Sequence, residues 1–311
     1  MDDMPASILV VANPAAGNGT GTQAARRAVG EFEAAIAGGR AAPFLAGVEV
    51  DAAFLSSADQ TRSLIEGSAD RRAIVAVGGD GLVHLVVNAL MAIAPERRPA
   101  LAVVPAGTGN DYARALGLPL DLKRSVHVIL QASPRPVDLG LCNGEYFAET
   151  LSFGLDAAIA LDTVRRREET GRSDAGVYFA SGIDQLTHNL VSRNYHGNLD
   201  GHPIEGTSVT FAVQVGPYYG GGFKICPEAK IDDGVLDLCI SHPPVSVTRA
   251  IYIFMRAKNG KHVHMKPMEF ARARHALIEF DEEPPCQIDG EPLHATRFDI
   301  TCEHQALRVL A

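Results

Sequence analysis

The sequence predicts an α/β domain built on a parallel sheet, followed by a mainly antiparallel β domain that we expect to be a sandwich. Two observations lead to this prediction. In the first third of the chain, a short apolar run ends in a glycine-rich turn and leads into a helical stretch, and this arrangement occurs three times. Beyond about residue 137, short β-like runs separated by turn residues replace it. We expect the domains to span residues 1–135 and 136–311, and a return of the extreme C-terminus to the first domain stays open.

The three strand–turn–helix units predict where a ligand binds. Parallel sheets bind ligands at the carboxyl ends of their strands, and all three glycine-rich turns fall at such ends. The expected strand and helix pairs are Ser7–Ala12 with Gln23–Ala37, Ala73–Val77 with Leu82–Ile93, and Leu101–Pro105 with Asp111–Leu116.

The second domain is marked by turn residues between its β-like runs, among them Pro217, Asp232-Asp233-Gly234 and Pro284-Pro285. We place the boundary near Pro134–Pro136 and expect a helical or loop insertion over Thr163–Thr187. The β-like runs include Tyr146–Ser152, Ser208–Val215, Leu236–Ser241, Ala276–Phe280 and Phe298–Cys302.

Composition excludes several classes of protein. A formal net charge of −9 argues against non-specific nucleic-acid binding through a broad basic face. The acidic start does not fit a secretory signal, and no apolar stretch approaches the ~20 residues needed to span a bilayer. Five widely spaced cysteines without a CxxC pair indicate reduced thiols. We therefore expect a cytoplasmic protein whose membrane contact, if any, is peripheral and at the inner face.

The turn Gly78-Gly79-Asp80-Gly81 is the first candidate anion site. Glycine allows a tight turn that exposes successive N–H groups, and the following helix N-terminus favours an anion. Because Asp80 would repel a bare phosphate, its presence indicates a metal or a hydrogen-bonded network. A tight turn without any ligand is the alternative.

Two further turns follow the same logic. Gly107-Thr108-Gly109-Asn110-Asp111 adds hydrogen-bonding side chains from Thr108 and Asn110, and Asp111 either takes part or only caps the next helix. The turn from Asn13 to Gly19 matches neither the GxGxxG fingerprint nor a Walker A loop.

These motifs, taken in order, resemble the diacylglycerol kinase catalytic family, which includes sphingosine kinases and bacterial lipid kinases. The resemblance runs over nearly the whole chain. It rests on Asn13-Pro14 with Gly17, Gly78-Gly79-Asp80-Gly81, Pro105 to Asp111 with Ala113-Arg114, Val137-Asp138-Leu139-Gly140, Phe153-Gly154-Leu155-Asp156, Gly220-Gly221-Gly222, Pro227 with Ala229 and Asp233-Gly234, and Asp289-Gly290-Glu291.

The resemblance implies a phosphofructokinase-like nucleotide domain and a β-sandwich, with the active site in the cleft between them. It also implies ATP and Mg²⁺ as cofactors and a lipid hydroxyl as acceptor, as in phospholipid biosynthesis. Glu291 would be the general base, although an ordinary hairpin turn is the alternative for its motif. Asp80, Asp111 and Asp138 would form a supporting acidic network.

By the same resemblance, a loop from Lys230 to Val235 would hold a structural magnesium, with the Asp233 carboxylate and the carbonyls of Lys230 and Val235 as ligands. A turn capped by aspartate is the alternative. Arg114 would contact phosphate or the lipid head. The nucleotide contacts would be Asn13, Gly17, Ser56, Gly78, Gly79, Asp80, Gly81, Gly107, Thr108, Gly109, Asn110 and Arg114.

The chain departs from the family pattern after the first glycine turn. Leu82, His84 and Leu85 stand where relatives carry threonine, asparagine and glutamate. His84 is either a substitute ligand or base, or simply a solvated residue near a helix start. These departures keep two other functions open: a non-catalytic nucleotide or lipid sensor, and a soluble-substrate kinase of the NAD kinase type.

Basic residues cluster between Arg249 and His275, where Glu269 is the only acid, and again at Arg165-Arg166-Arg167. Such patches either hold the protein transiently at an anionic membrane or are solvated faces of β-hairpins. We expect a lipid substrate and no nucleic-acid partner, and a homodimer stays open.

Overall fold

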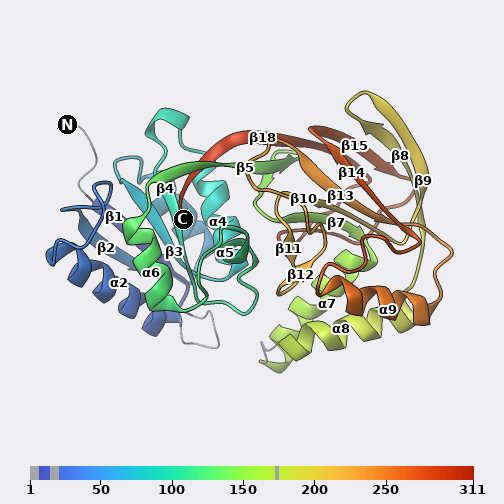
Figure 1. Cartoon of the computed structure of the whole chain (residues 1–311), viewed down its shortest axis with the longest axis horizontal. Helices are drawn as coiled ribbons and strands as arrows, with labels where there is room; N and C mark the ends of the chain where they lie inside the picture. Colours follow the sequence, from blue (N-terminus) through green and yellow to red (C-terminus); the bar gives the residue numbers. More distant parts are fainter. Residues whose placement is uncertain (1–6, 15–20, 172–174) are drawn as a thin grey trace. The chain divides into compact units, whose positions relative to one another are not determined.

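The computed structural model describes residues 7–14, 21–171 and 175–311. The chain divides into two compact units, one made of Met1–Val137 with Gln305–Ala311 and the other of Asp138–His304 (Figure 1). The sequence places its domain boundary after residue 135.

A parallel sheet forms the centre of the first unit. Its order is β2-β1-β3-β4, and every pairing among these strands is parallel. Strands β3 and β4 are buried throughout, because helices pack on the sheet. The strands are β1 (Ser7–Ala12), β2 (Glu49–Phe54), β3 (Ala73–Gly78) and β4 (Ala100–Pro105).

The strand order determines on which face of the sheet each helix of this unit lies. The chain moves from β1 outward to β2, and then crosses back to β3 and β4 on the other side of β1. Since crossovers between parallel strands are right-handed, the helix after β1 lies on the opposite face from the helices after β2 and β3. The helices are α2 (Gly21–Ala37), α3 (Ala58–Glu66), α4 (Asp80–Met91), η1 (Pro95–Arg97), α5 (Asp111–Ala115) and α6 (Leu122–Gln131).

The three predicted strand and helix pairs are present. The sequence pattern did not single out β2 and α3, because β2 is an edge strand with exposed, charged positions and shows no apolar run. The strand order reverses between β1 and β3, which is where parallel α/β sheets leave a crevice for ligands.

The last residues of the chain complete the first unit. Strand β18 (Arg297–Leu310) ends parallel to β4, with Val309 opposite Leu101. Arg98, which is buried, holds this end in place. Its Nη1 donates to the carbonyl oxygen of Ala306 at 2.7 Å, and its Nη2 donates to that of Ile93 at 2.9 Å, just past the end of α4.

The second unit contains two layers of β-strands. One is an antiparallel sheet in the order β14-β13-β10-β7-β16-β17, and the other is formed by β18, β15, β8 and β9, with β5 and β6 beside β18. The strands are β5 (Pro134–Cys142), β6 (Glu145–Phe147), β7 (Thr150–Gly154), β8 (Arg193–Leu199), β9 (His202–Ser208), β10 (Thr210–Gln214), β11 (Tyr218–Tyr219), β12 (Phe223–Lys224), β13 (Leu236–Ser241), β14 (Met268–Ala273), β15 (His275–Phe280), β16 (Cys286–Ile288) and β17 (Glu291–Pro292).

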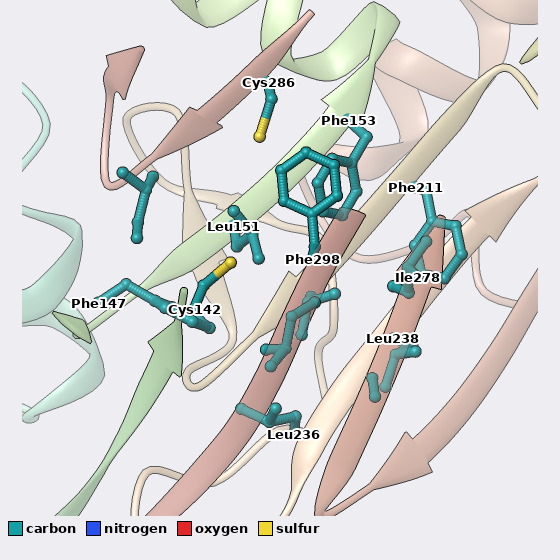
Figure 2. Packing of buried hydrophobic residues seen from close by; sticks show 14 of the residues in the cluster. Cys142, Phe147, Leu151, Phe153, Phe211, Leu236, Leu238, Ile278, Cys286 and Phe298 are labelled. Carbon is teal, nitrogen blue, oxygen red and sulfur yellow. The ribbon is translucent and has the colours of Figure 1, made fainter. Parts of the chain in front are cut away.

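Aromatic side chains fill the space between these layers (Figure 2). The ring of Phe153 on β7 lies 4.5 Å from that of Phe298 on β18 and 6.0 Å from that of Phe211 on β10. Because one core takes side chains from both layers, the unit is a β-sandwich. The predicted fold class is confirmed.

Three helices cover the six-stranded sheet away from this core. They are α7 (Leu155–Thr170), α8 (Ala175–His188) and α9 (Val247–Ala257), and they enclose a second apolar cluster with Val209 and Phe223. The insertion expected over Thr163–Thr187 is therefore helical in its described part. The interpretation of the basic stretch as hairpin faces is wrong for α9, whose buried residues recur at helical spacing. None of the described helices is long and apolar enough to cross a membrane.

We predict that Arg98→Met lowers the free energy of unfolding by about 3 kcal/mol, because it leaves several buried carbonyl oxygens without their charged donor. Thermal unfolding measured by calorimetry checks this, with Arg62→Met on the exposed side of α3 as the matched control. An equal effect of the two substitutions would contradict the role of Arg98.

Candidate functional site

The turns after β3 and β4 touch each other through their glycines. A β-carbon on Gly107 would lie 2.3 Å from the Cα of Gly79, and one on Gly79 would lie 3.0 Å from the Cα of Gly107. The backbone N–H of Ala106 also donates to the carbonyl oxygen of Gly78 at 2.9 Å. Only glycine allows this approach, so the sequence Gly78-Gly79 and Gly107 has a direct steric reason.

Two carboxylates lie where these turns meet. Asp80 opens α4 and Asp111 opens α5, and one carboxylate oxygen of each lies within 4.8 Å of the other. The Oδ1 atom of Asp80 accepts a long hydrogen bond of 3.4 Å from the N–H of Tyr112. Asp111 is almost fully buried, and Arg114 approaches its carboxylate at 3.8 Å. Two of the three aspartates in the predicted acidic network, Asp80 and Asp111, therefore lie together in the first unit, whereas Asp138 belongs to the second unit.

Asn110 shapes the second turn. It adopts a left-handed backbone conformation (φ 54°), and its side chain accepts from the N–H of Gly107 at 2.9 Å and donates to the Gly107 carbonyl at 2.8 Å. Arg114 donates to the carbonyl oxygen of Gly109 at 3.4 Å, whereas Thr108 is exposed. The Asn110 side chain therefore stabilises the conformation of the turn through its two hydrogen bonds with Gly107.

The remaining nucleotide candidates also follow strand ends. Asn13 comes directly after β1, and Ser56 is exposed after β2. Ser57 caps α3, since its side chain accepts from the N–H of Gln60 at 3.3 Å. Gly17 lies outside the described residues. The four parallel strands thus direct candidates from four different turns to one edge of the sheet.

The departures from the family pattern lie on α4. Leu82 packs on the backbone of Gly78, where a β-carbon would come within 2.8 Å of its Cδ2 atom. The expectation that His84 is solvated is wrong: its exposed fraction is 8%. The His84 side chain lies beside that of Asn88, with 3.5 Å between His84 Nε2 and Asn88 Nδ2, and Asn88 Nδ2 also donates to the His84 carbonyl oxygen at 3.0 Å.

In the second unit, Asp289 fixes the hairpin that carries Glu291. The buried Asp289 carboxylate accepts from the N–H groups of Ala148 at 2.8 Å, Glu149 at 3.0 Å and Thr150 at 2.9 Å. Its backbone is left-handed (φ 48°) and its N–H donates to the Thr150 carbonyl. Glu291 itself is exposed on β17. The arrangement presents an exposed carboxylate on a fixed backbone.

Asp138 holds the loop that was predicted to bind a metal. Its Oδ2 accepts from the N–H of Gly234 at 2.6 Å, its own N–H donates to Ile231, and His304 Nδ1 lies 2.7 Å from its Oδ1. Asp233 is exposed on the same loop. Asp138 thus acts on the loop around Asp233, within the second unit.

A hollow that is partly open to solvent lies between α7, α8, α9 and the six-stranded sheet. Apolar residues form most of its wall. Two polar groups stand out, because Asp156 Oδ2 and His262 Nδ1 are buried and have no hydrogen-bond partner among the described residues. The apolar part of the wall is made of Leu155, Ile159, Leu186, Val209, Ile225, Val245, Ala250, Ile253, Phe254, Ala257 and Met268.

Burial shifts the protonation of Asp156. It raises the pKa of this carboxyl to about 7, although a hydrogen bond from Ser152 acts in the opposite direction. Burial also lowers the pKa of His262. Both groups are therefore driven toward their neutral forms, which suits an apolar hollow that offers hydrogen-bonding groups to a ligand.

Sequence reasoning named Asp156 and Asp289 within motifs but assigned a role to neither, and it did not single out His262. A signal existed for Asp156, since it is the one charged residue in the stretch from Leu151 to Leu161. Asp289 has no comparable signal, because its partners are about 140 residues away in the sequence.

The raised pKa of Asp156 predicts a pH-dependent stability. The folded state binds a proton that the unfolded chain has already released, so stability falls as the pH rises from the unfolded value toward 7. Between pH 5 and pH 8, the free energy of unfolding of the native protein should fall by about 3 kcal/mol more than that of the Asp156→Asn variant. Thermal unfolding at several pH values measures this, with the exposed Glu282→Gln as control. Parallel pH profiles of native protein and Asp156→Asn would contradict the prediction.

Comparisons with known proteins cover both units. Residues 7–142 match the family model of the diacylglycerol kinase catalytic domain, and residues 149–311 match that of the YegS C-terminal NAD kinase beta sandwich-like domain. The diacylglycerol kinase of Bacillus subtilis is 29% identical over 219 residues, 70% of each chain. A protein of Chromohalobacter salexigens named "Probable lipid kinase YegS-like" is 31% identical over 231 residues, which are 72% of this chain and 71% of that protein.

Solved structures show the same fold. A diacylglycerol kinase structure from Bacillus anthracis has a TM-score of 0.76 at 24% identity and covers 98% of this chain and 96% of its own. An NAD kinase from Archaeoglobus fulgidus in complex with ATP has a TM-score of 0.51 at 11% identity, with 98% and 93% covered. The sequence matches and the fold agree, and the chain belongs to the diacylglycerol kinase catalytic family of lipid kinases.

Proposed function

We propose that this protein transfers the γ-phosphoryl group of ATP to a hydroxyl group of a lipid such as diacylglycerol. Membership in the family supports phosphoryl transfer. The observation that carries the proposal is the contact between Gly79 and Gly107, which places two glycine turns together at the carboxyl edge of the sheet. Backbone N–H groups from such turns, with the N-terminus of α4, favour a polyphosphate.

Mg²⁺ is part of the proposal, and the donor set fits it. Asp80 and Asp111 supply hard carboxylate oxygens within 4.8 Å of each other, which suits a small divalent cation. When bound there, Mg²⁺ would neutralise phosphate charge. The loop around Asp233 offers a second set, made of its exposed carboxylate with the carbonyls of Lys230 and Val235, and Asp138 orders this loop.

Glu291 is the proposed general base, which accepts the proton of the lipid hydroxyl as the phosphoryl group is transferred. Its exposure keeps the carboxylate accessible to substrate, and Asp289 fixes the backbone next to it. In this proposal Asp289 is a positioning residue and does not touch the reacting atoms.

The hollow beneath α9 is the proposed site for the apolar part of the acceptor. Its wall accepts an acyl chain, while Asp156 and His262 offer polar atoms to a hydroxyl or ester group. A soluble acceptor of the NAD kinase type would not need such a wall. This difference favours a lipid acceptor over that alternative.

A radiometric assay with [γ-³²P]ATP over mixed lipids tests the proposal. We predict label in a lipid extract, and we predict that Glu291→Gln lowers kcat by about 10²–10⁴-fold because the proton acceptor is lost. Nucleotide binding, measured by calorimetry, should persist in this variant. Glu282→Gln, at another exposed carboxylate of the second unit, is the matched control.

The same assay distinguishes the kinase from a non-catalytic nucleotide or lipid sensor, the alternative that the departures at Leu82 and His84 favour. Nucleotide binding without any labelled lipid, in native protein and in Glu291→Gln alike, would overturn the kinase proposal. Label in NADP and none in lipid would support the soluble-substrate alternative.

We also predict that Ala250→Leu raises KM for long-chain acceptors by about tenfold, because the added methyl groups narrow the hollow. KM for short-chain acceptors and for ATP should change little. Thr248→Leu, on the exposed side of the same helix, serves as control. If the Ala250→Leu variant keeps the native preference for acyl-chain length, the hollow is not part of the acceptor site.

A further inference from the structure

Helix α9 has two faces of different character. Ala250, Ile253 and Ala257 are buried and line the hollow together with residues of the sheet. On the outer side, Tyr252 is 51% exposed and Met255 is 56% exposed, which is unusual for side chains of this size. The outer side therefore offers apolar surface that nothing in the second unit covers among its described residues.

Helix α8 extends this apolar surface. Phe179 is 46% exposed, and its ring lies 6.0 Å from that of Phe254 on α9. Val247, at the start of α9, is 36% exposed. Half of the eight large apolar residues that are exposed in the described chain thus lie on these two helices, which run together along one side of the second unit (Figure 1).

The segment of the chain that contains α9 is rich in positive charge. Between His242 and Met268 the chain carries five lysines and arginines and no acid, although its overall net charge is −9. The Arg256 guanidinium lies over the Tyr252 ring, 5.9 Å from its centre, and Arg249 donates to the Lys266 carbonyl at 2.7 Å. Lys261 is exposed, and its backbone N–H donates to the carbonyl oxygen of Arg256 in the last turn of α9.

The other basic patch does not compete for this role. Arg165 is bound to Asp162 and Glu169, and Arg166 is bound to Asp162 and Asp184. Their charges are balanced by carboxylates of α7 and α8, which leaves the segment around α9 as the stronger anion-attracting surface.

We propose that the outer face of α8 and α9, defined by Phe179, Val247, Tyr252 and Met255, binds the surface of an anionic lipid bilayer. The apolar side chains enter the interface between headgroups and acyl chains, where tyrosine is favoured, and the surrounding lysines and arginines face anionic headgroups. Because the inner face of the same helix walls the hollow, docking brings that hollow to the acyl layer; this consequence alone rests on the proposed function.

Charge selects the bilayer over a second copy of the chain. A two-fold contact through this face would place the same cations opposite one another without an acid from this segment to offset them. An anionic bilayer supplies the opposite charge to all of them.

Co-sedimentation of the full chain with vesicles tests the proposal without ATP or turnover. Vesicles of phosphatidylcholine with about one third phosphatidylglycerol should bind the protein, and binding should weaken with added salt. Tyr252→Ser with Met255→Ser should lower the partition coefficient about tenfold. Lys261→Gln with Lys266→Gln should lower it about 25-fold, or fivefold for each cation.

Substitutions of the same kind on the first unit serve as controls for the apolar and for the basic variant. Leu120→Ser removes an apolar side chain that is 40% exposed, and Arg26→Gln with Arg62→Gln removes two exposed cations. Neither should alter partitioning. Since Tyr252 and Met255 do not line the hollow, their variant should phosphorylate a soluble short-chain acceptor at the native rate and lose rate only on vesicles.

Three results would overturn the proposal. One is equal binding to neutral and anionic vesicles, another is equal loss in the control variants, and the third is a dimer in light scattering that the Tyr252 and Met255 changes abolish. If the vesicle results hold and no acceptor is ever labelled, the docking face stands and the kinase proposal falls.

Discussion

The backbones of Gly79 and Gly107 touch, and the positions of the other groups in the first unit follow from this contact. Any side chain at either position would separate the turns after β3 and β4. With the turns together, Asp80 and Asp111 start their helices side by side and Asn110 closes the second turn on itself. The contact in turn depends on neighbouring parallel strands that end at the same level, with Gly78 opposite Pro105.

The second unit positions its groups by a different means. Here buried carboxylates collect backbone N–H groups from distant segments: Asp289 binds three successive residues before and within β7, and Asp138 binds the loop around Asp233. A carboxylate that accepts several N–H groups is held firmly and holds its partners in return. The exposed residues beside these anchors, Glu291 and Asp233, can then be accessible without being loosely placed.

Sequence patterns predicted what local physics determines. Apolar runs followed by glycine turns identified β1, β3 and β4, since burial and tight turning are properties of the segment itself. Strand β2 was not predicted because an edge strand needs no continuous apolar run. Helix α9 was not predicted because its run of β-branched and aromatic residues, Ile251 to Phe254, is typical of a strand. The roles of Asp289 and the burial of His84 depend on partners and packing that only the folded chain brings together.

The buried carboxyl of Asp156 lowers the stability of the layer formed by α7, α8 and α9. A buried carboxyl whose pKa is raised to about 7 is disfavoured in its charged form, and its unpartnered oxygen forgoes a hydrogen bond that water would supply. In the proposed function, a hydroxyl group of the acceptor would supply that bond and would thereby stabilise the folded layer. Apolar side chains could have closed the hollow at lower cost. The proposed acceptor is itself partly apolar and partly polar, and such a ligand would match both the apolar wall of the hollow and the buried acid in it.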